Sequence, residues 1–114
     1  MALNYNLSKV YAISDNDTEF AKQIVTLFNE EVPAEVKNIR KGLKEKDHSR
    51  VYHAAHKIKP TLDLLGMDLA YDDILVIENW SKAEGKKKEI KDVVKNLKHL
   101  VGLTIKELKK DYSL

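Results

Sequence analysis

The chain has 114 residues, a net charge of only +2 and no cysteine. This length predicts one domain, residues 1–114, and the lack of cysteine excludes disulfide frameworks, thiolate zinc sites and cysteine nucleophiles. The first residues do not form a secretory signal, and the longest apolar run, residues 74–77, is far shorter than the roughly 20 residues of a membrane span. We therefore expect a monomeric protein of the cytoplasm that makes no contact with a membrane.

Apolar residues recur at helical spacing along the sequence, and no stretch alternates as a strand would. A short amphipathic piece at residues 7–11 is followed by a polar turn at residues 14–17, which offers an N-cap. A long helix then directs these side chains inward: Phe20, Ile24, Leu27, Phe28, Val32, Val36, Ile39 and Leu43. Pro33 lies within this helix, so we expect a bend there, or a stop and restart.

Three further helices follow. Asp47 is expected to cap the first of them, whose core stripe comprises Val51, Ala55, Ile58, Leu62 and Leu65. Gly66 suits its C-terminal exit, and Asp68 is expected to cap the next helix, in which Ala70, Ile74 and Ile77 face inward. After a turn at Gly85, the last helix carries its apolar stripe from Ile90 to Leu108. The pattern predicts an all-α fold, an antiparallel four-helix bundle with a short extra N-terminal helix.

Positive charge gathers near the C-terminal end of the sequence. Residues 86–110 contain nine lysines and only three acids. A solvated helix face is the interpretation we favour, and an acidic partner or nucleic acid is the alternative. We do not expect nucleic acid as the partner, because no helix-turn-helix or aromatic platform accompanies the lysines. A basic nucleic-acid-binding helical protein nevertheless stays open as an alternative function.

His56 is separated from the core stripe of its helix. At about 100° per residue it falls about 140° from the centre of that stripe, on the solvent side. Tyr52, His53 and Asp63 share this outer arc, and Lys59 lies one turn beyond His56 at its edge. His48 and His99 have no such neighbours in the sequence, so we expect both to be plain surface residues, whereas Trp80 and Tyr71 should pack between helices.

An exposed histidine between two lysines is suited to carrying a phosphoryl group. Its neutral ring is a nucleophile near physiological pH, and Lys57 and Lys59 can meet the negative phosphoryl oxygens. Ala55 is small, which brings the backbone close to the core and leaves the imidazole of His56 exposed. An ordinary surface histidine is the alternative. A metal site is not expected, because His53, His56 and Asp63 are too few ligands and lie among cations.

The segment 55–66 resembles the signature of histidine-containing phosphotransfer (HPt) domains, which belong to the phosphorelays of two-component signal transduction. That signature has alanine before the histidine, leucine or isoleucine two places after it, lysine at the third place and glycine at the fourth and tenth places. Ala55, His56, Ile58, Lys59 and Gly66 match it. The resemblance covers essentially the whole chain, because these domains are also small helical bundles with the histidine on the second long helix.

The resemblance implies a phosphocarrier with no kinase activity and no cofactor of its own. His56 would accept a phosphoryl group from the aspartate of a receiver domain, in a response regulator or a hybrid sensor kinase, and pass it to another receiver. Lys59 would stabilise the phosphoryl charge, Lys57 would assist, and the receiver would supply Mg²⁺. Docking and local shape would fall to Tyr52, His53, Ala55, Pro60, Asp63 and Gly66.

Pro60 departs from the family's pattern, because it replaces the glycine at the fourth place after the histidine. A proline inside a helix cannot donate to the carbonyl of His56 and crowds it, so we expect the helix to bend outward there. The compact ring still leaves clearance for the imidazole. Pro60 also motivates the alternative function, a non-catalytic helical interaction module that kept the fold and lost the transfer.

Overall fold

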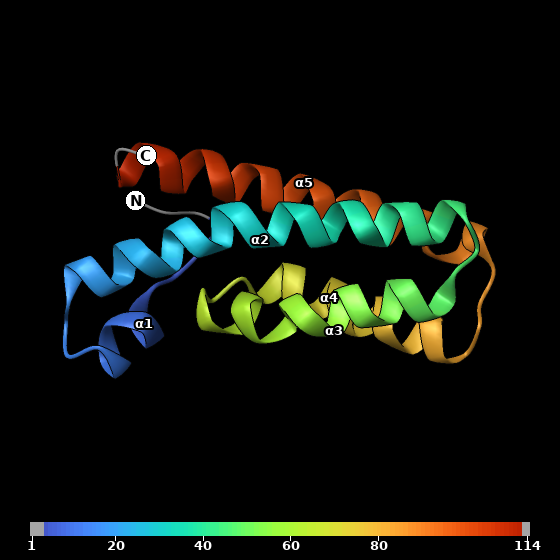
Figure 1. The fold of residues 1–114 in the computed structure, drawn as a ribbon, viewed down its shortest axis with the longest axis horizontal. Helices are drawn as coiled ribbons and strands as arrows, with labels where there is room; N and C mark the ends of the chain where they lie inside the picture. Colours follow the sequence, from blue (N-terminus) through green and yellow to red (C-terminus); the bar gives the residue numbers. More distant parts are fainter. Residues whose placement is uncertain (1–3, 113–114) are drawn as a thin grey trace.

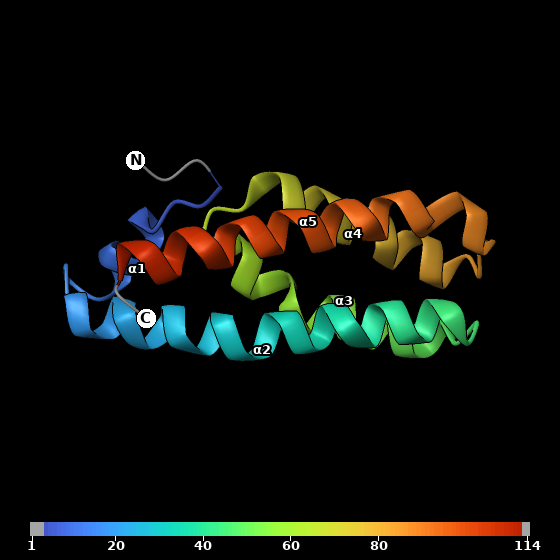
Figure 2. The same ribbon diagram turned by 90° about the horizontal axis from the view of Figure 1, so that it is seen from above.

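The computed structural model describes residues 4–112, and this part of the chain contains five α-helices and no strand. The helices are α1 (Ser8–Ile13), α2 (Thr18–Lys44), α3 (His48–Leu64), α4 (Asp68–Lys82) and α5 (Lys87–Asp111). The long helices α2 and α4 each pack against both α3 and α5, and the short α1 packs against α2 (Figures 1 and 2). The all-helical prediction is confirmed. None of these helices combines the length and the apolarity needed to cross a membrane.

Side-chain caps set two helix starts where the sequence predicts them. The carboxylate of Asp17 accepts from the backbone N–H groups of Glu19 and Phe20, and that of Asp47 accepts from Arg50. At the end of α3, Gly66 has a φ of +62°, which glycine adopts without strain.

The prediction that Asp68 caps α4 was wrong. The carbonyl of Met67 accepts from the N–H of Tyr71 at 2.8 Å, so Met67 occupies the N-cap position, and no side chain caps this helix. Asp68 is instead the first residue of α4, where a negative charge is favoured by the helix dipole.

The core runs along the axis of the molecule and is almost entirely aliphatic. The predicted stripe of α3 is buried completely: Val51, Ala55, Ile58, Leu62 and Leu65. In α2 the prediction for Leu27 was wrong, because its side chain is 49% exposed. The buried stripe of α2 passes through Val25, Phe28 and Val32, and Leu27 lies about 140° away from the centre of that stripe at about 100° per residue.

Each of the two prolines lies inside a helix. The helix α2 continues through Pro33 without a stop, and in Figure 1 its N-terminal turns slope away from the line of the rest. The helix α3 likewise continues through Pro60, and Figure 2 shows its last turns leaving the side of α2. The divergence of the last turns of α3 from α2 therefore occurs within a continuous helix that contains Pro60.

At one end of the molecule, His48 at the start of α3 packs against Trp80 near the end of α4. The Nε2 atom of His48 lies 2.9 Å from the carbonyl oxygen of Gly85, and its ring centroid lies 4.8 Å from that of Trp80. The indole N–H of Trp80 donates to the carbonyl of Lys86 at 2.9 Å. A Cβ atom on Gly85 would lie 2.3 Å from the indole, so this turn requires glycine. The prediction that His48 is a plain surface residue was therefore wrong.

A tyrosine cluster lies at the opposite end. The hydroxyl groups of Tyr11, on α1, and Tyr112, after α5, are 3.1 Å apart. The hydroxyl of Tyr5 donates to the carboxylate of Asp111, near the end of α5. Burial raises the pKa of both Tyr5 and Tyr112, and the neighbouring polar groups raise it further. These contacts tie the N-terminal segment and α1 to the last helix.

Candidate functional site

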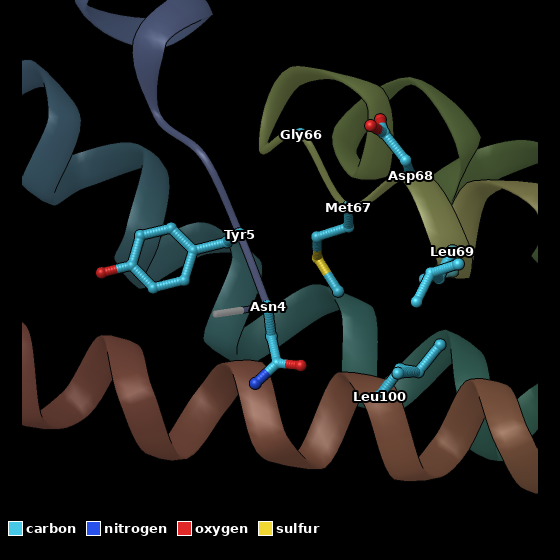
Figure 3. A pocket seen from close by; sticks show the side chains of 8 residues that line it. Asn4, Tyr5, Gly66, Met67, Asp68, Leu69 and Leu100 are labelled. Carbon is cyan, nitrogen blue, oxygen red and sulfur yellow. The ribbon is translucent and has the colours of Figure 1, made fainter. Parts of the chain in front are cut away.

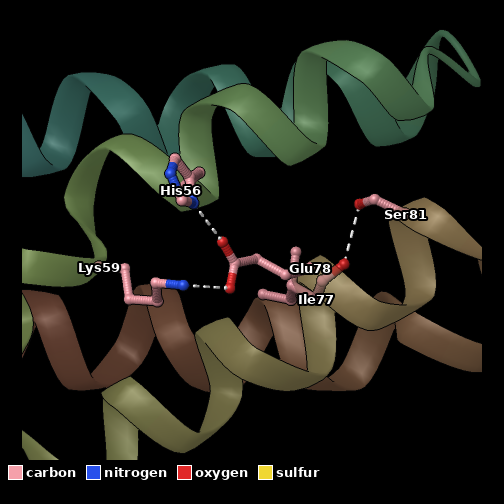
Figure 4. Close-up of polar contacts among 5 residues, drawn as sticks. All are labelled: His56, Lys59, Ile77, Glu78 and Ser81. Carbon is pink, nitrogen blue, oxygen red and sulfur yellow. Dashed lines mark hydrogen bonds and ion pairs between the residues drawn. The ribbon is translucent and has the colours of Figure 1, made fainter.

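His56 lies on α3 at its border with α4. Its side chain is 58% exposed, as the sequence predicts, yet one ring nitrogen also contacts a buried carboxylate. The Nδ1 atom lies 2.9 Å from Oε2 of Glu78, which projects from α4 (Figure 4). The exposed ring of His56 is therefore hydrogen-bonded to the protein through Nδ1.

Glu78 is a carboxylate buried between the two helices, with only 5% of the residue exposed. Its second oxygen, Oε1, accepts a hydrogen bond from Nζ of Lys59 at 3.0 Å, so each oxygen has a partner (Figure 4). Burial alone would raise the pKa of Glu78, but the bonds from Lys59 and His56 outweigh it and hold that pKa below its usual value. In return, the hydrogen bond to Glu78 raises the pKa of Lys59.

The Glu78 contact determines which ring nitrogen of His56 is free. An ionised carboxylate only accepts hydrogen bonds, so Nδ1 carries the proton and Nε2 keeps a lone pair in the neutral ring. Within residues 4–112, no group hydrogen-bonds to Nε2. This arrangement fixes the tautomer and leaves the lone pair of Nε2 without a partner among the described residues.

Tyr52 covers one side of the imidazole. Its ring is nearly parallel to that of His56, with an interplanar angle of 12° and centroids 5.5 Å apart. Lys82, one turn after Glu78 on α4, places its Nζ atom 5.3 Å from the centroid of the Tyr52 ring. His53 lies against the edge of the same tyrosine, with ring centroids 5.8 Å apart. The structure thus gathers both predicted docking aromatics beside His56.

Two predicted site residues are engaged elsewhere. The Nζ atom of Lys57 pairs with Glu35 of α2 at 3.0 Å, which raises the pKa of the lysine. Asp63 pairs with Lys9 of α1 at 2.9 Å. Neither residue joins the group around His56 in this structure.

The remaining predicted residues have structural roles close to the site. Ala55 is fully buried, which brings the α3 backbone against the core directly before His56. Pro60 is exposed one turn after the histidine, and Gly66 ends the helix in the left-handed conformation.

Glu78 and Lys82 were absent from the sequence prediction. A signal for Glu78 was present, because it follows Ile77 and precedes the buried Ser81 within the core-facing part of α4. The hydroxyl of Ser81 donates a hydrogen bond to the carbonyl of Ile77, within the same helix, at 2.8 Å (Figure 4). An acid at such a position needs a partner from another helix, and only the fold shows which one.

No family model, curated protein or solved structure matches this chain. The functional argument therefore rests on the residues of the site and their geometry. In the described part of the chain, no group of three or more histidines and acids is placed to hold a metal ion.

A cavity of about 200 Å³ lies well away from His56, between the N-terminal segment, the α3–α4 turn and α5 (Figure 3). It is lined by Asn4, Tyr5, Gly66, Met67, Asp68, Leu69, Ala70 and Leu100. Leu64, the last residue of α3, is eight residues beyond His56, which corresponds to roughly 12 Å of helix, and Gly66 follows it. Its lining offers no histidine, and the cavity takes no part in the site.

The lowered pKa of Glu78 predicts a pH-dependent contribution to stability. A carboxylate whose pKa in the folded state lies below its ordinary 4.5 stabilises the fold above that pH, and this is lost as the pH falls through the folded pKa. We expect the difference in unfolding free energy between the wild type and Glu78→Gln to shrink between about pH 5 and about pH 3 in urea titrations. A constant difference over this range would show that the Glu78 charge contributes nothing to folding.

Proposed function

We propose that this chain is a phosphocarrier of the HPt type, which accepts a phosphoryl group on Nε2 of His56. The observation that carries the proposal is the half-exposed imidazole whose Nδ1 is hydrogen-bonded to the buried Glu78, itself held by Lys59. An ordinary surface histidine needs no such support. A second support is the Ala-His-x-Ile-Lys segment around His56, which resembles the signature of HPt domains.

The transfer step follows from the tautomer. The lone pair of Nε2 attacks the phosphorus of a receiver's aspartyl phosphate, so an N–P bond forms, the P–O bond to the aspartate breaks, and the aspartate leaves as a carboxylate. Positive charge then develops on the ring of His56, which still carries its proton on Nδ1. The Glu78 carboxylate accepts that N–H and stabilises the charge. The reverse step delivers the phosphoryl group to a second receiver.

Two cations would balance the phosphoryl oxygens. Lys59 gives Glu78 one of its three N–H donors, which leaves two for a phosphoryl group bound one turn away. Lys82 holds its Nζ atom 5.3 Å from the centroid of the Tyr52 ring, which stacks on His56. Lys57 could join them only by leaving Glu35. We therefore assign charge stabilisation to Lys59 and Lys82 ahead of Lys57.

The proposal extends to the setting of the protein. The four long helices would form the antiparallel four-helix bundle of such carriers, with α1 as the extra helix, in a monomer in the cytoplasm. Its partners would be receiver domains of response regulators and hybrid sensor kinases, and the receiver would bring the Mg²⁺ used in transfer. The chain would have no kinase activity of its own.

Incubation with a phosphorylated receiver domain tests the function directly. We expect radiolabel to move from receiver to protein and to be lost in acid but retained in base, as for a phosphoramidate. Labelling from ATP alone should be absent. Stable binding to receivers without any transfer of label would instead favour the interaction module that Pro60 suggests, and neither binding nor label would remove both proposals.

Substitution of Pro60 tests whether the bend in α3 serves the transfer. Pro60→Ala should raise the free energy of unfolding by about 1 kcal/mol or more, because alanine restores the backbone bond to His56. Phosphoryl transfer should fall, since a straighter helix aims the imidazole differently. Pro60→Gly, the usual residue of the family, should keep the transfer rate and gain less stability. If thermal melts and single-turnover assays show that alanine raises both quantities, the proline has no functional role.

A further inference from the structure

A basic groove runs between α2 and α5, two of the helices labelled in Figure 2. Its volume is about 510 Å³, and it is lined by Lys37, Arg40, Lys41, Leu43, Lys44, Lys87, Lys91, Val94 and Lys95. Seven of these nine residues are cations, and none is an acid. A second hollow of about 300 Å³ continues the groove along the same two helices. It shares Lys37 and Arg40 with the first and adds Pro33, Val36, Lys98, Val101, Gly102 and Ile105.

The cations form two facing stripes. On α2 they recur three and four residues apart from Lys37 to Lys44, and on α5 they recur every four residues from Lys87 to Lys95. Such spacing places each set along one face of its helix. The stripes line the two sides of the groove. Apolar side chains form its floor, of which Leu43 and Val94 are buried, whereas Pro33 and Ile105 are partly exposed.

None of the groove cations forms an ion pair with any acid among residues 4–112. Elsewhere the same chain does pair its exposed lysines, as Lys9 with Asp63 and Lys57 with Glu35 show. Like charges three and four residues apart on a helix repel one another, so the free protein is destabilised by this arrangement. An anionic partner in the groove would relieve the repulsion.

We propose that this groove binds an acidic amphipathic helix of a partner protein. The acidic flanks of that helix would pair with the two cation stripes, and its apolar residues would cover the floor. From Lys87 to Ile105 the groove follows about 27 Å of α5 at about 1.5 Å per residue, which suits a helix of about 18 residues. Nucleic acid fits less well, because phosphates gain nothing from an apolar floor and the chain as a whole carries only +2.

The groove is independent of the site at His56. That site lies between α3 and α4, whereas the groove lies between α2 and α5, the opposite pair of the four packed helices. A helix bound in the groove therefore leaves His56 accessible. Failure of phosphoryl transfer would therefore not contradict peptide binding in the groove, and failure of peptide binding would not contradict phosphoryl transfer.

Fluorescence anisotropy with a labelled peptide tests the proposal. The probe is a helix of about 18 residues with leucines spaced three and four residues apart, glutamates on both flanks and alanine elsewhere. We expect saturable binding to the full chain that weakens as salt is added. A scrambled peptide of the same composition, which has the charge but no apolar stripe, should bind at least about fivefold more weakly. Equal binding of the two peptides, or no binding of either, overturns the proposal.

A triple variant locates the binding on the groove. Lys41→Gln/Lys91→Gln/Lys95→Gln should weaken the peptide by about tenfold or more, and its melting temperature should equal or exceed that of the wild type because repulsion is reduced. This gain or constancy in stability shows that lost binding does not arise from unfolding.

A matched variant controls for net charge. Lys106→Gln/Lys109→Gln/Lys110→Gln removes the same charge from α5 outside the groove, and it should change peptide binding by less than about twofold. An equal loss of peptide affinity in the two triple variants would show that the peptide binds through unspecific charge attraction, and it would overturn the proposal. Tighter binding of a DNA duplex or of anionic lipid vesicles than of the peptide, in the same buffer, would also overturn it.

Discussion

Replacing His56 with glutamine should abolish phosphoryl acceptance and leave the fold intact. Glutamine has no ring nitrogen with a nucleophilic lone pair, so no N–P bond can form. Its amide N–H can still donate to Glu78, which keeps the buried carboxylate partnered. Because the imidazole is 58% exposed, we expect the free energy of unfolding to change by less than about 1 kcal/mol. Transfer of radiolabel from a phosphorylated receiver and a thermal melt measure the two quantities.

His53→Gln is the matched control, because His53 is one turn earlier on the same helix, is exposed and contacts only the edge of Tyr52 among the aromatic rings of the site. It should retain most of the transfer activity. If His56→Gln still takes up phosphate, the phosphoryl acceptor is a different residue. Activity lost equally in both variants would point to damage to docking rather than to loss of the nucleophile.

The second large effect is expected from Glu78→Gln, a substitution of a residue that does not touch the phosphoryl group. The glutamine amide can donate to Nδ1 of His56, which would place the ring proton on Nε2 and remove the lone pair that attacks. It also removes the negative charge that stabilises the ring during transfer. Loss of such supporting partners slows reactions by about 10- to 100-fold, and we expect transfer to fall in that range.

Two further measurements separate positioning from simple destabilisation. The nitrogen-15 chemical shifts of His56 should report mainly the Nδ1–H tautomer in the wild type and a clear shift toward Nε2–H in Glu78→Gln. Asp72→Asn removes the same charge from an exposed position on α4 and should leave both the tautomer and the transfer rate unchanged. A Glu78→Gln protein with an altered melting temperature but an unaltered rate and tautomer would limit Glu78 to a structural role.

Much of the helical framework was predictable because it depends on short-range periodicity. The stripe from Val51 to Leu65 repeats every three or four residues, and Asp47 and Gly66 mark the two ends of α3, so its bounds and its buried face follow from local chemistry. The same reasoning failed for Leu27, because apolar residues occur around much of α2 and only packing against α3 and α5 decides which of them are buried.

The sequence predicts the exposed histidine of the site but not the partner that holds it. Exposure of His56 follows from its angle on one helix, whereas its partner Glu78 comes from another helix 22 residues later in the chain. Lys59 shows the same limit, since its place one turn after the histidine was correct but its bond to a buried carboxylate depends on how α3 and α4 meet. Contacts between helices are set by the fold as a whole, and no local pattern specifies them.

The contact between His48 and Trp80 gives the protein a built-in optical reporter. Trp80 is the only tryptophan in the chain, so indole emission comes from the end where α4 meets the turn before α5. The indole lies against the ring of His48, with centroids 4.8 Å apart, so loss of this contact changes the surroundings of the fluorophore directly. Three of the five tyrosines, Tyr5, Tyr11 and Tyr112, lie at the other end of the molecule. Unfolding followed at the two ends at once would reveal whether the helices melt together or separate from one end first.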